Sequence, residues 1–439
     1  MTRLGDVCEK IGSGATPRGG KEAYKDAGIP IIRSQNIHDW VFQPDGLAFL
    51  DDEQAESLSN VEVRSNDVLL NITGDSVARA CIVPSERIPA RVNQHVAIVR
   101  AGKEINPTYL LASLQSKKTT LLSLASSGAT RNALTKRMIE NLDIDLPSRE
   151  MQDSIAQVLD SIQYKITLNN RLNDYLFELV SSVFAHRFSD NVNTTELKNV
   201  LSISTKALKP QEHADEIWEH YSIPAFDEKH RPIFEPASGI KSNKYQIDSE
   251  CILISKLNPS TKRIWMPCCS SNNAVCSTEF IVYRPYLKEY KSFYYAAIDS
   301  PRFTDYLLEH VSGSTGSRQR AQPKDTLNYL MPNPDNEEIK DFCTFADPIY
   351  RHIQINEQQT AKLELLRETL LPKLMSGAID VSKVDLTQLT NNHLSGCGSF
   401  CSVCCPSGLA SEFHEWFREH FFFGYGHLCK ADLGWEDLP

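Results

Sequence analysis

The chain contains a long internal repeat, and this feature constrains its fold more than any other. Residues 166–169 (Ile-Thr-Leu-Asn) correspond to residues 353–356 (Ile-Gln-Ile-Asn), at an offset of 187 residues. Further matches follow in the same order in both halves, including the loops Ser-Gly-Ala-Thr-Arg at 127–131 and Ser-Gly-Ser-Thr-Gly at 312–316. An ordered series of matches predicts two copies of one structural plan.

Each copy is predicted to be a globular part followed by a long helix. Short β-like runs with turn signals fill residues 1–147 and again 191–333, and each part also contains a helix, near 108–126 and near 290–311. The long helices are expected at 148–190 and 334–380. The predicted fold class is therefore α+β, with two β-rich domains joined by two long helices in a pseudo-two-fold repeat. Residues 381–439 form a Cys-rich extension that we expect to be poorly ordered.

The heptad positions of both helices are mostly apolar and turn polar in the middle. They are Ile155, Val158, Ile162, Lys165, Asn169, Leu172, Leu176, Leu179 and Val183 in the first helix, and Phe342, Phe345, Ile349, His352, Asn356, Gln359, Leu363, Leu366 and Leu370 in the second. Asn169 and Asn356 occupy equivalent places, where a buried Asn costs stability but fixes register. We expect the two helices to pair with each other; the alternative is two amphipathic helices that each pack on their own domain.

Charge and hydropathy limit where the chain can act. The formal net charge of −10 argues mildly against a free-standing DNA binder, although half of it falls after residue 379, so that local basic loops or a basic partner could still meet phosphate. No run of about 18 apolar residues predicts a membrane span, and the polar N-terminus lacks a secretory signal. A cytoplasmic location is expected.

The repeated plan of domain, helix, domain and helix resembles the specificity subunits of type I restriction–modification systems over about residues 1–380. The resemblance rests on Leu-Gly-Asp-Val at 4–7, Gly-Ser-Gly-Ala-Thr-Pro at 12–17, Gly-Ile-Pro-Ile-Ile-Arg at 28–33 and Leu-Leu-Pro-Lys-Leu-Met-Ser-Gly at 370–377. It also includes Ser-Gly-Ala-Thr at 127–130 ahead of a Leu-Pro exit into the helix.

The resemblance implies a DNA-reading subunit without catalytic activity of its own. Each globular part would be a target-recognition domain for one half of a split double-stranded DNA site, and the helices would form an antiparallel coiled coil that sets the spacer. Two methyltransferase subunits would bind this frame, with restriction subunits as further partners. S-adenosylmethionine, ATP and Mg would be bound by those partners and not by this chain.

Base recognition requires Arg or Lys for guanine and Asn or Gln for adenine, and phosphate contacts require basic and small polar groups. Two loops at equivalent places of the repeat, near Arg131 and Arg318, are the strongest candidates because basic residues occur there twice. The alternative is that these side chains are solvated surface groups. The candidate DNA-binding residues are Gln35, Asn36, Arg131, Asn132, Lys136, Arg137, Lys262, Arg263, Arg318, Arg320 and Lys324.

Motifs for an independent enzyme are incomplete. Asp347-Pro348-Ile349-Tyr350 lacks the second proline of an adenine-methyltransferase motif, and Gly20-Lys21 lacks the remainder of a phosphate-binding loop. The tail contains Cys397, Cys401 and Cys404, a spacing that occurs in iron–sulfur proteins and would also permit zinc, but no second close pair completes a site. We therefore expect no bound metal. Two alternatives stay open: a coiled-coil interaction protein without a DNA role, and a metal-cluster protein that uses this tail.

Overall fold

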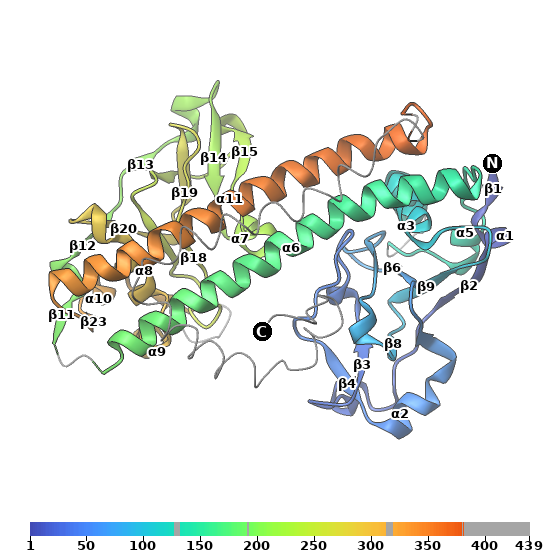
Figure 1. Cartoon of the computed structure of the whole chain (residues 1–439), viewed down its shortest axis with the longest axis horizontal. Coiled ribbons are helices and arrows are strands. Elements are labelled where there is room, and N and C mark those ends of the chain that lie inside the picture. The colour runs from blue at the N-terminus through green and yellow to red at the C-terminus, as the bar shows by residue number, and fades with distance from the viewer. Residues whose placement is uncertain (127–131, 191–192, 313–318, 380, 382–439) are drawn as a thin grey trace, which may run out of the picture. The chain divides into compact units, whose positions relative to one another are not determined.

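The computed structural model describes residues 1–126, 132–190, 193–312, 319–379 and 381 (Figure 1). It divides into two compact units, each containing helices and sheets, which confirms the predicted α+β class. Unit 1 comprises Met1–Tyr164 and the described residues from Glu364 onward, and unit 2 comprises Lys165–Leu363. Arg131, Arg318 and, apart from Val381, the Cys-rich tail lie outside the described residues.

Two four-stranded sheets form the centre of unit 1. The first is antiparallel and has the order β2-β9-β6-β7 (Cys8–Ser13, Val96–Ala101, Val68–Asn71 and Ala80–Ile82). The second has the order β4-β3-β8-β5 (Ala48–Leu50, Ile29–Ile32, Ala90–Val92 and Glu62–Val63), with β3 and β8 parallel. Ile31, Leu69 and Ile98 share one buried cluster, so the two sheets pack on a common core.

Unit 2 repeats this topology with one additional strand. Its antiparallel sheet has the order β12-β20-β17-β18 (Leu201–Ser204, Phe280–Pro285, Ile252–Ser255 and Ile264–Trp265). Its second sheet has the order β13-β16-β19-β14-β15 (Ala207–Leu208, Lys244–Gln246, Ala274–Ser277, Ile217–Tyr221 and Ile233–Pro236), and β14 and β19 are again parallel. The repeat seen in the sequence is thus also present in the strand order.

Short paired strands and helices complete each unit. In unit 1 these are β1 with β10 (Thr2–Arg3, Asp143–Ile144), α1 (Leu4–Val7), α2 (Asp52–Ser57) and α5 (Lys136–Glu140). In unit 2 they are β11 with β23 (Thr194–Glu196, Leu330–Pro332), β21 with β22 (Val311–Ser312, Arg320–Ala321), α7 (Ile223–Lys229) and α10 (Pro323–Thr326).

Each of the helices predicted near 108–126 and 290–311 is in fact two helices. In unit 1, α3 (Pro107–Ser116) is followed by α4 (Lys118–Ser126). In unit 2, α8 (Lys291–Ile298) is followed by α9 (Pro301–Glu309). The second interruption has a direct cause, because Ser300 caps α9 through its hydroxyl and Pro301 has no N–H to continue the preceding helix.

The long helices are α6 (Arg149–Phe188) and α11 (Asn336–Met375), each of 40 residues. Within unit 2, Nδ2 of Asn169 lies 3.4 Å from Oγ1 of Thr360, and Nδ2 of Asn356 lies 2.8 Å from Oδ1 of Asn173. An advance of four residues along α6 is matched by a return of four along α11, so the two helices run in opposite directions there.

The buried stripe of both helices differs from the predicted heptad seam at several positions. Predicted seam positions that are only partly buried or are exposed are Lys165, Leu172, Leu179, Val183, Phe345, His352, Gln359, Leu363, Leu366 and Leu370. In all of these cases except Leu363 the next residue is buried, namely Ile166, Asn173, Val180, Phe184, Ala346, Ile353, Thr360, Arg367 and Leu371. A helix that packs on a globular core as well as on another helix buries a wider stripe, at i, i+4 and i+7, than a strict coiled coil does.

No helix among the described residues is sufficiently long and apolar to cross a membrane.

Candidate nucleic-acid interface

The carboxyl ends of β3 and β8 meet at one edge of unit 1 because these neighbouring strands are parallel. The backbone N–H of Asn93, just after β8, donates to the carbonyl of Ile32 at the end of β3 over 3.0 Å. The amide of Asn71, at the end of β6, donates to the carbonyl of Ser34 over 2.9 Å. The loops that follow β3, β6 and β8 therefore come together at this edge.

Of the two residues predicted after β3, only Gln35 is exposed. Asn36 is fully buried; its Oδ1 accepts from the backbone N–H of Arg33 at 3.0 Å, and its Nδ2 donates to the carbonyls of Gln43 and Asp45 at 2.9 and 3.1 Å. The direct base contact predicted for Asn36 is not open to this side chain in the structure. Its amide satisfies backbone groups of its own loop and so holds Gln35 in place.

The other described candidates of unit 1 follow Arg131 in the chain. Asn132, Lys136 and Arg137 are all exposed. The carbonyl of Asn132 accepts from the backbone N–H of Gly74 over 3.1 Å, which places it beside the hairpin between β6 and β7. Lys136 forms only a surface ion pair with Glu140 at 3.4 Å, an interaction that contributes little to stability.

In unit 2, the predicted pair Lys262 and Arg263 is engaged in ion pairs with the protein itself. Lys262 contacts Asp299 at 2.6 Å. Arg263 binds the carboxylate of Asp227 through two nitrogens, at 2.5 and 2.9 Å, and its side chain is only 10% exposed. A DNA phosphate would have to displace these carboxylates, so the structure favours a stabilising role for Arg263.

The remaining candidates of unit 2 follow Arg318. Lys324 is exposed in α10, and Arg320 is exposed in β22. The guanidinium of Arg320 faces the carboxylate of Glu279, with Nε and one terminal nitrogen at 3.1 and 3.4 Å. This arrangement orients the guanidinium without burying it, because its side chain remains 48% exposed.

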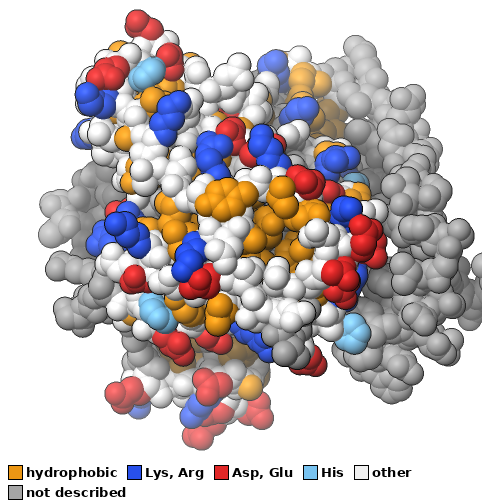
Figure 2. All heavy atoms as spheres, turned by 90° about the vertical axis from the view of Figure 1, so that its left-hand side faces the viewer, with side chains coloured by type: hydrophobic (Ala, Val, Ile, Leu, Met, Phe, Trp, Pro, Cys, Tyr) orange, Lys and Arg blue, Asp and Glu red, His pale blue; other side chains and the backbone are white. Residues whose placement is uncertain are grey.

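Charge alone does not identify an interface on the part of unit 2 that includes β11, β12 and β23. Figure 2 shows hydrophobic side chains at the centre of this face and interspersed positive and negative side chains around them. Nearby elements expose Leu308 of α9 and Leu330 of β23, which are 38% and 58% exposed. A mixed surface of this kind lacks the single-sign field expected of a phosphate-tracking surface.

The two units share the same backbone hydrogen bonds around the hairpin loops. Asn71 N–H donates to Arg79 in unit 1, and Ser255 N–H donates to Arg263 in unit 2, at 2.8 and 2.9 Å. Three further N–H to carbonyl bonds of unit 1 each have an equivalent in unit 2. Ile72 donates to His95 as Lys256 donates to Glu279, Leu134 donates to Ile72 as Ala321 donates to Lys256, and Gly74 donates to Asn132 as Asn258 donates to Gln319. We call these four bonds of unit 1, together with their four equivalents in unit 2, the duplicated framework. It places Asn132 and Gln319, the first described residues after the two basic loops, in equivalent positions.

A polar chain of side chains at the framework of unit 1 was not predicted from the sequence. The Thr16 hydroxyl donates to Oε1 of Gln94, Nε2 of Gln94 lies 3.1 Å from Nε2 of His95, and Nδ1 of His95 lies 2.7 Å from the Thr73 hydroxyl. Gln94 and His95 form the turn between β8 and β9. The only signal in the sequence was a polar pair between two β-like runs, and Thr16 lies 78 residues from Gln94.

Gly14 allows this arrangement because its backbone lies directly on the turn after β8. A Cβ atom at this position would be 2.0 Å from the carbonyl oxygen of Val92. The next residue, Ala15, donates its N–H to the same carbonyl over 3.0 Å. The Gly-Ser-Gly-Ala-Thr-Pro stretch thus carries Thr16 to the side chain of Gln94.

The predicted register residues Asn169 and Asn356 are 1% and 4% exposed. Their hydrogen bonds across unit 2 involve two further polar side chains, Asn173 and Thr360, which are also buried. Each of these follows its predicted Asn by four residues, which was the available sign in the sequence that they share its helix face.

Unit 2 also contains a half-buried His–Glu pair. Nδ1 of His230 lies 3.6 Å from Oε1 of Glu357, and the imidazole stacks on Trp265 with ring centroids 5.4 Å apart. Burial raises the pKa of Glu357 to about 8 and lowers the pKa of His230 to about 4. Desolvation outweighs attraction at this distance, which favours the neutral form of both groups.

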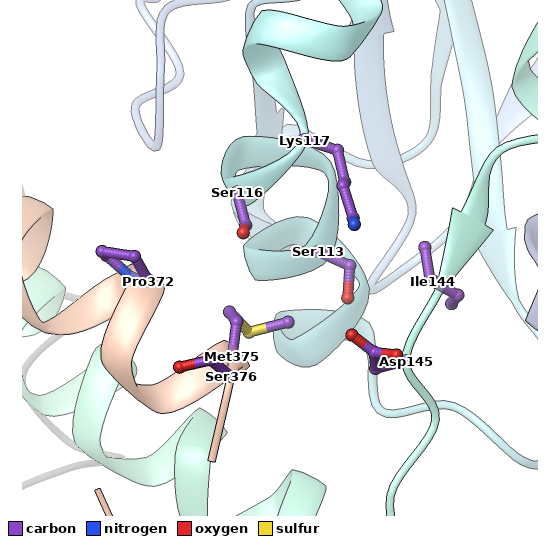
Figure 3. Close-up of a pocket in the computed structure, with 8 residues that line it drawn as sticks. All are labelled: Ser113, Ser116, Lys117, Ile144, Asp145, Pro372, Met375 and Ser376. Carbon is purple, nitrogen blue, oxygen red and sulfur yellow. The ribbon is translucent and has the colours of Figure 1, made fainter. Parts of the chain in front are cut away.

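A pocket of about 160 Å³ lies in unit 1 between α3 and the end of α11 (Figure 3). It is lined by Ser113, Ser116, Lys117, Ile144, Asp145, Pro372, Met375 and Ser376. Ser113 donates its hydroxyl to the carbonyl of Tyr109 at 2.8 Å, and these described lining residues include no histidine that could activate a hydroxyl. The pocket does not have the constellation of a nucleophilic enzyme.

No cluster of three or more His, Cys, Asp or Glu side chains suited to a metal occurs in the described ranges. Burial raises the pKa of Cys8 and of Cys268 to about 12, so these thiols are protonated near pH 7 and are poor metal ligands. The expectation that the tail binds no metal stays a prediction, because Cys397, Cys401 and Cys404 lie outside the described residues.

Residues 1–176 match the family described as the type I restriction modification DNA specificity domain. This part of the chain is therefore similar to the specificity subunits of type I restriction–modification systems. A stretch of 178 residues is 23% identical to the protein of Methanocaldococcus jannaschii named as the MjaX type I restriction enzyme specificity subunit. This alignment covers 39% of the chain and only 41% of that relative's length.

A solved structure of a specificity subunit resembles the chain in fold. The crystal structure of the S subunit of a type I restriction–modification system from M. genitalium matches with a TM-score of 0.53 and 14% identity, over 85% of this chain and 95% of that one. The HsdS subunit from Thermoanaerobacter tengcongensis matches with a TM-score of 0.33 and 18% identity, over 86% and 96% of the two chains.

Proposed function

We propose that the chain recognises a bipartite DNA site for a type I restriction–modification complex, with unit 1 and unit 2 each contacting one half-site. The observation that carries this proposal is the duplicated framework, which presents different exposed side chains in the two units. One backbone arrangement used twice with different side chains is suited to recognising two different short sequences. The match of residues 1–176 to a DNA specificity domain supports the same function.

In this proposal the two long helices hold the half-sites at a fixed spacing as an antiparallel coiled coil. The buried Asn169 and Asn356 fix the helix register, since an unpaired amide in the interior would penalise a shifted pairing. A helix of 40 residues is about 60 Å long at 1.5 Å per residue, which is sufficient to separate two recognition elements. In this proposal the recognition domains are residues 1–147 and 191–333, and the spacer helices are residues 148–190 and 334–380.

Partners and chemistry follow from the same proposal. Two methyltransferase subunits dock on the helical frame, restriction subunits join where they exist, and the complex acts on cytoplasmic DNA. The chain itself is non-catalytic, and S-adenosylmethionine, ATP and Mg belong to the partners. The alternatives of a coiled-coil protein without a DNA role and of a metal-cluster protein gain no supporting observation from the described residues.

The surface candidates retain different roles. Gln35, Asn132 and Arg320 are exposed at the loop edges and are proposed for base contacts, together with Arg131 and Arg318 from the equivalent basic loops. Lys136, Arg137 and Lys324 are exposed and are proposed for phosphate contacts. Lys262 and Arg263 contribute only where DNA replaces their carboxylate partners.

A methylation map tests the function. The chain is co-expressed with a methyltransferase subunit in a host that lacks adenine methylation, and modified adenines are mapped by single-molecule sequencing. We expect one split motif with a fixed gap, and exchange of residues 1–147 for those of another family member changes one half only. Absence of a motif, while the same methyltransferase is active beside another specificity subunit, contradicts the proposal.

A further inference from the structure

The turn after β8 in unit 1 presents a side-chain amide that is held in place by the protein. A primary amide has two hydrogens and two acceptor lone pairs. Gln94 uses one lone pair for the Thr16 hydroxyl and one hydrogen for His95, and its side chain is exposed. One donor and one acceptor are therefore available, side by side, for a group in the solvent.

Two neighbouring side chains hold this amide in place. The amide nitrogen of Gln94 is only a donor, so Nε2 of His95 must accept, and the imidazole proton then lies on Nδ1, where it is donated to the Thr73 hydroxyl. Thr73 and Gln94 are in this way joined through one ring. A reversed amide pairs equally well with the other imidazole tautomer, in which Nε2 donates and Nδ1 accepts from the Thr73 hydroxyl. In either arrangement Thr16 and His95 hold the amide in place and leave it one donor and one acceptor.

The turn itself is rigid and is duplicated. The backbone N–H of His95 donates to Oδ1 of Asn93, and that of Glu279 donates to Oγ of Ser277, both at 3.2 Å. Together with the duplicated framework, this makes Gln94 equivalent to Thr278 and His95 equivalent to Glu279. The backbone is the same in both units while the presented chemistry differs.

We infer that Gln94 is a specificity-determining residue of unit 1 and contacts an adenine in the major groove. Adenine presents the N6 donor and the N7 acceptor side by side, which complements the remaining acceptor and donor of a glutamine amide. Thr16 and His95 are positioning residues that hold the amide in place. This inference rests on the proposed function and adds to it the base recognised by one residue.

Unit 2 supplies a built-in comparison for the same turn. Glu279, at the position of His95, binds Arg320 through two guanidinium nitrogens, and Arg320 lies at the position of Ala133 in the framework. A guanidinium is the group that most often recognises O6 and N7 of guanine. The same turn thus supports an amide in unit 1 and a guanidinium in unit 2, as two unlike half-sites require.

The test maps methylation by the wild-type chain, Gln94→Ala, Gln94→Glu and Thr16→Val, each co-expressed in full length with the methyltransferase subunit. Glu56→Ala, on the exposed face of α2, is the matched control. Gln94→Ala should relax a single adenine-containing position of one half-site, lowering discrimination there by about ten- to a hundred-fold. Thr16→Val should relax the same position less strongly, and Glu56→Ala should change nothing.

Gln94→Glu distinguishes a lost base contact from misfolding, because this variant is expected to prefer a different base and a misfolded protein would prefer none. The carboxylate still accepts from Thr16 but replaces a donor by an acceptor, so the position should favour cytosine, whose N4 amino group is a donor. Duplexes carrying each base at that position give the same ranking in binding assays with the complex.

The outcomes separate the inference from the proposed function. A wild-type split motif that stays strict at every position in Gln94→Ala and Gln94→Glu overturns the inference and leaves the proposed function intact. Loss of all methylation in Gln94→Ala, without a changed base preference in Gln94→Glu, also overturns it. No motif from the wild type removes the proposed function and the inference with it.

Discussion

Asn356 donates an amide hydrogen to Oδ1 of Asn173 over 2.8 Å in the interior of unit 2, and Asn173 in turn faces the carbonyl of Ile353 at 3.4 Å. Both asparagines are less than a tenth exposed. Such a pair favours one pairing of the helices over shifted ones, because any slip leaves two amides without partners in a poorly hydrated place.

Replacing only one member of this pair should be more harmful than replacing both. We expect Asn356→Leu to lower the free energy of unfolding by about 1–3 kcal/mol, since it leaves Oδ1 of Asn173 without its donor. Asn173→Leu together with Asn356→Leu should recover part of this loss. Chemical unfolding followed by circular dichroism measures the cycle, with the exposed Asn170→Leu as the control. Strictly additive losses would show that the amides do not interact.

Replacing Arg367 in unit 1 by lysine should destabilise the protein. Its guanidinium carbon lies 5.0 Å from the centroid of the Trp40 ring, it donates to Oε1 of Gln163, and the residue is only 5% exposed. A lysine lacks the planar group that stacks and donates at once. Arg367→Lys should lower the free energy of unfolding by about 1–2 kcal/mol, against no change for the exposed Arg87→Lys. Equal unfolding midpoints for the two variants would contradict this account.

Glu357 should make unit 2 less stable as pH rises. Burial raises the folded-state pKa to about 8, so between its ordinary value near 4.5 and pH 8 the folded form holds a proton that the unfolded form has released. The stabilisation is complete below about pH 4.5 and is lost as pH increases toward 8. The side chain keeps 24% exposure, which reduces the effect, so Glu357→Gln should gain about 1 kcal/mol at pH 8.

The contribution of His230 to stability depends on pH in the opposite direction, so the effects of the two groups can be distinguished. Its pKa is lowered to about 4 by burial, so its contribution is present above about pH 6.5 and is lost as pH falls toward 4. Thermal midpoints measured from pH 4 to 9 should therefore lose their alkaline slope in Glu357→Gln and keep their acidic slope. An unchanged alkaline slope in that variant would assign the effect to another group.

Arg320 and Lys324 should differ in how their removal affects DNA binding. Arg320 is oriented by Glu279 and is proposed for a base contact, so Arg320→Ala should relax one position of the second half-site by about 1–3 kcal/mol. Lys324→Ala should weaken binding to all sequences equally and reduce the slope of log K against log salt by about 1. Titrations at several salt concentrations with matched and mismatched duplexes distinguish the two. A uniform loss for both variants would place Arg320 on phosphate.

The features of the fold that follow from the order of elements along the chain could be predicted from the sequence. The offset of 187 residues located both long helices, and Asn169 and Asn356 are buried as their heptad positions suggested. The exact stripe was missed at Lys165 and Leu366, because it depends on what each helix packs against and not on periodicity alone.

The parts that depend on contacts between distant loops were not accessible. Asn36 has the residue type of a base-contacting side chain, and only its burial shows that it serves its own loop. Gln94 gave no comparable signal, since its role depends on Thr16 and on the closeness that Gly14 permits. Residue type suggests chemistry, whereas exposure and neighbours decide whether that chemistry is available.

The duplicated framework is made by main-chain N–H and carbonyl groups, which every residue except proline supplies in full. Substitutions at Gln94, Thr278 or Arg320 therefore leave these bonds formed. Under the proposed function, new DNA preferences can accumulate in one unit without compensating changes elsewhere in the protein. A chain built in this way can diversify the DNA sequences proposed for it while its folding remains under the same selection as before.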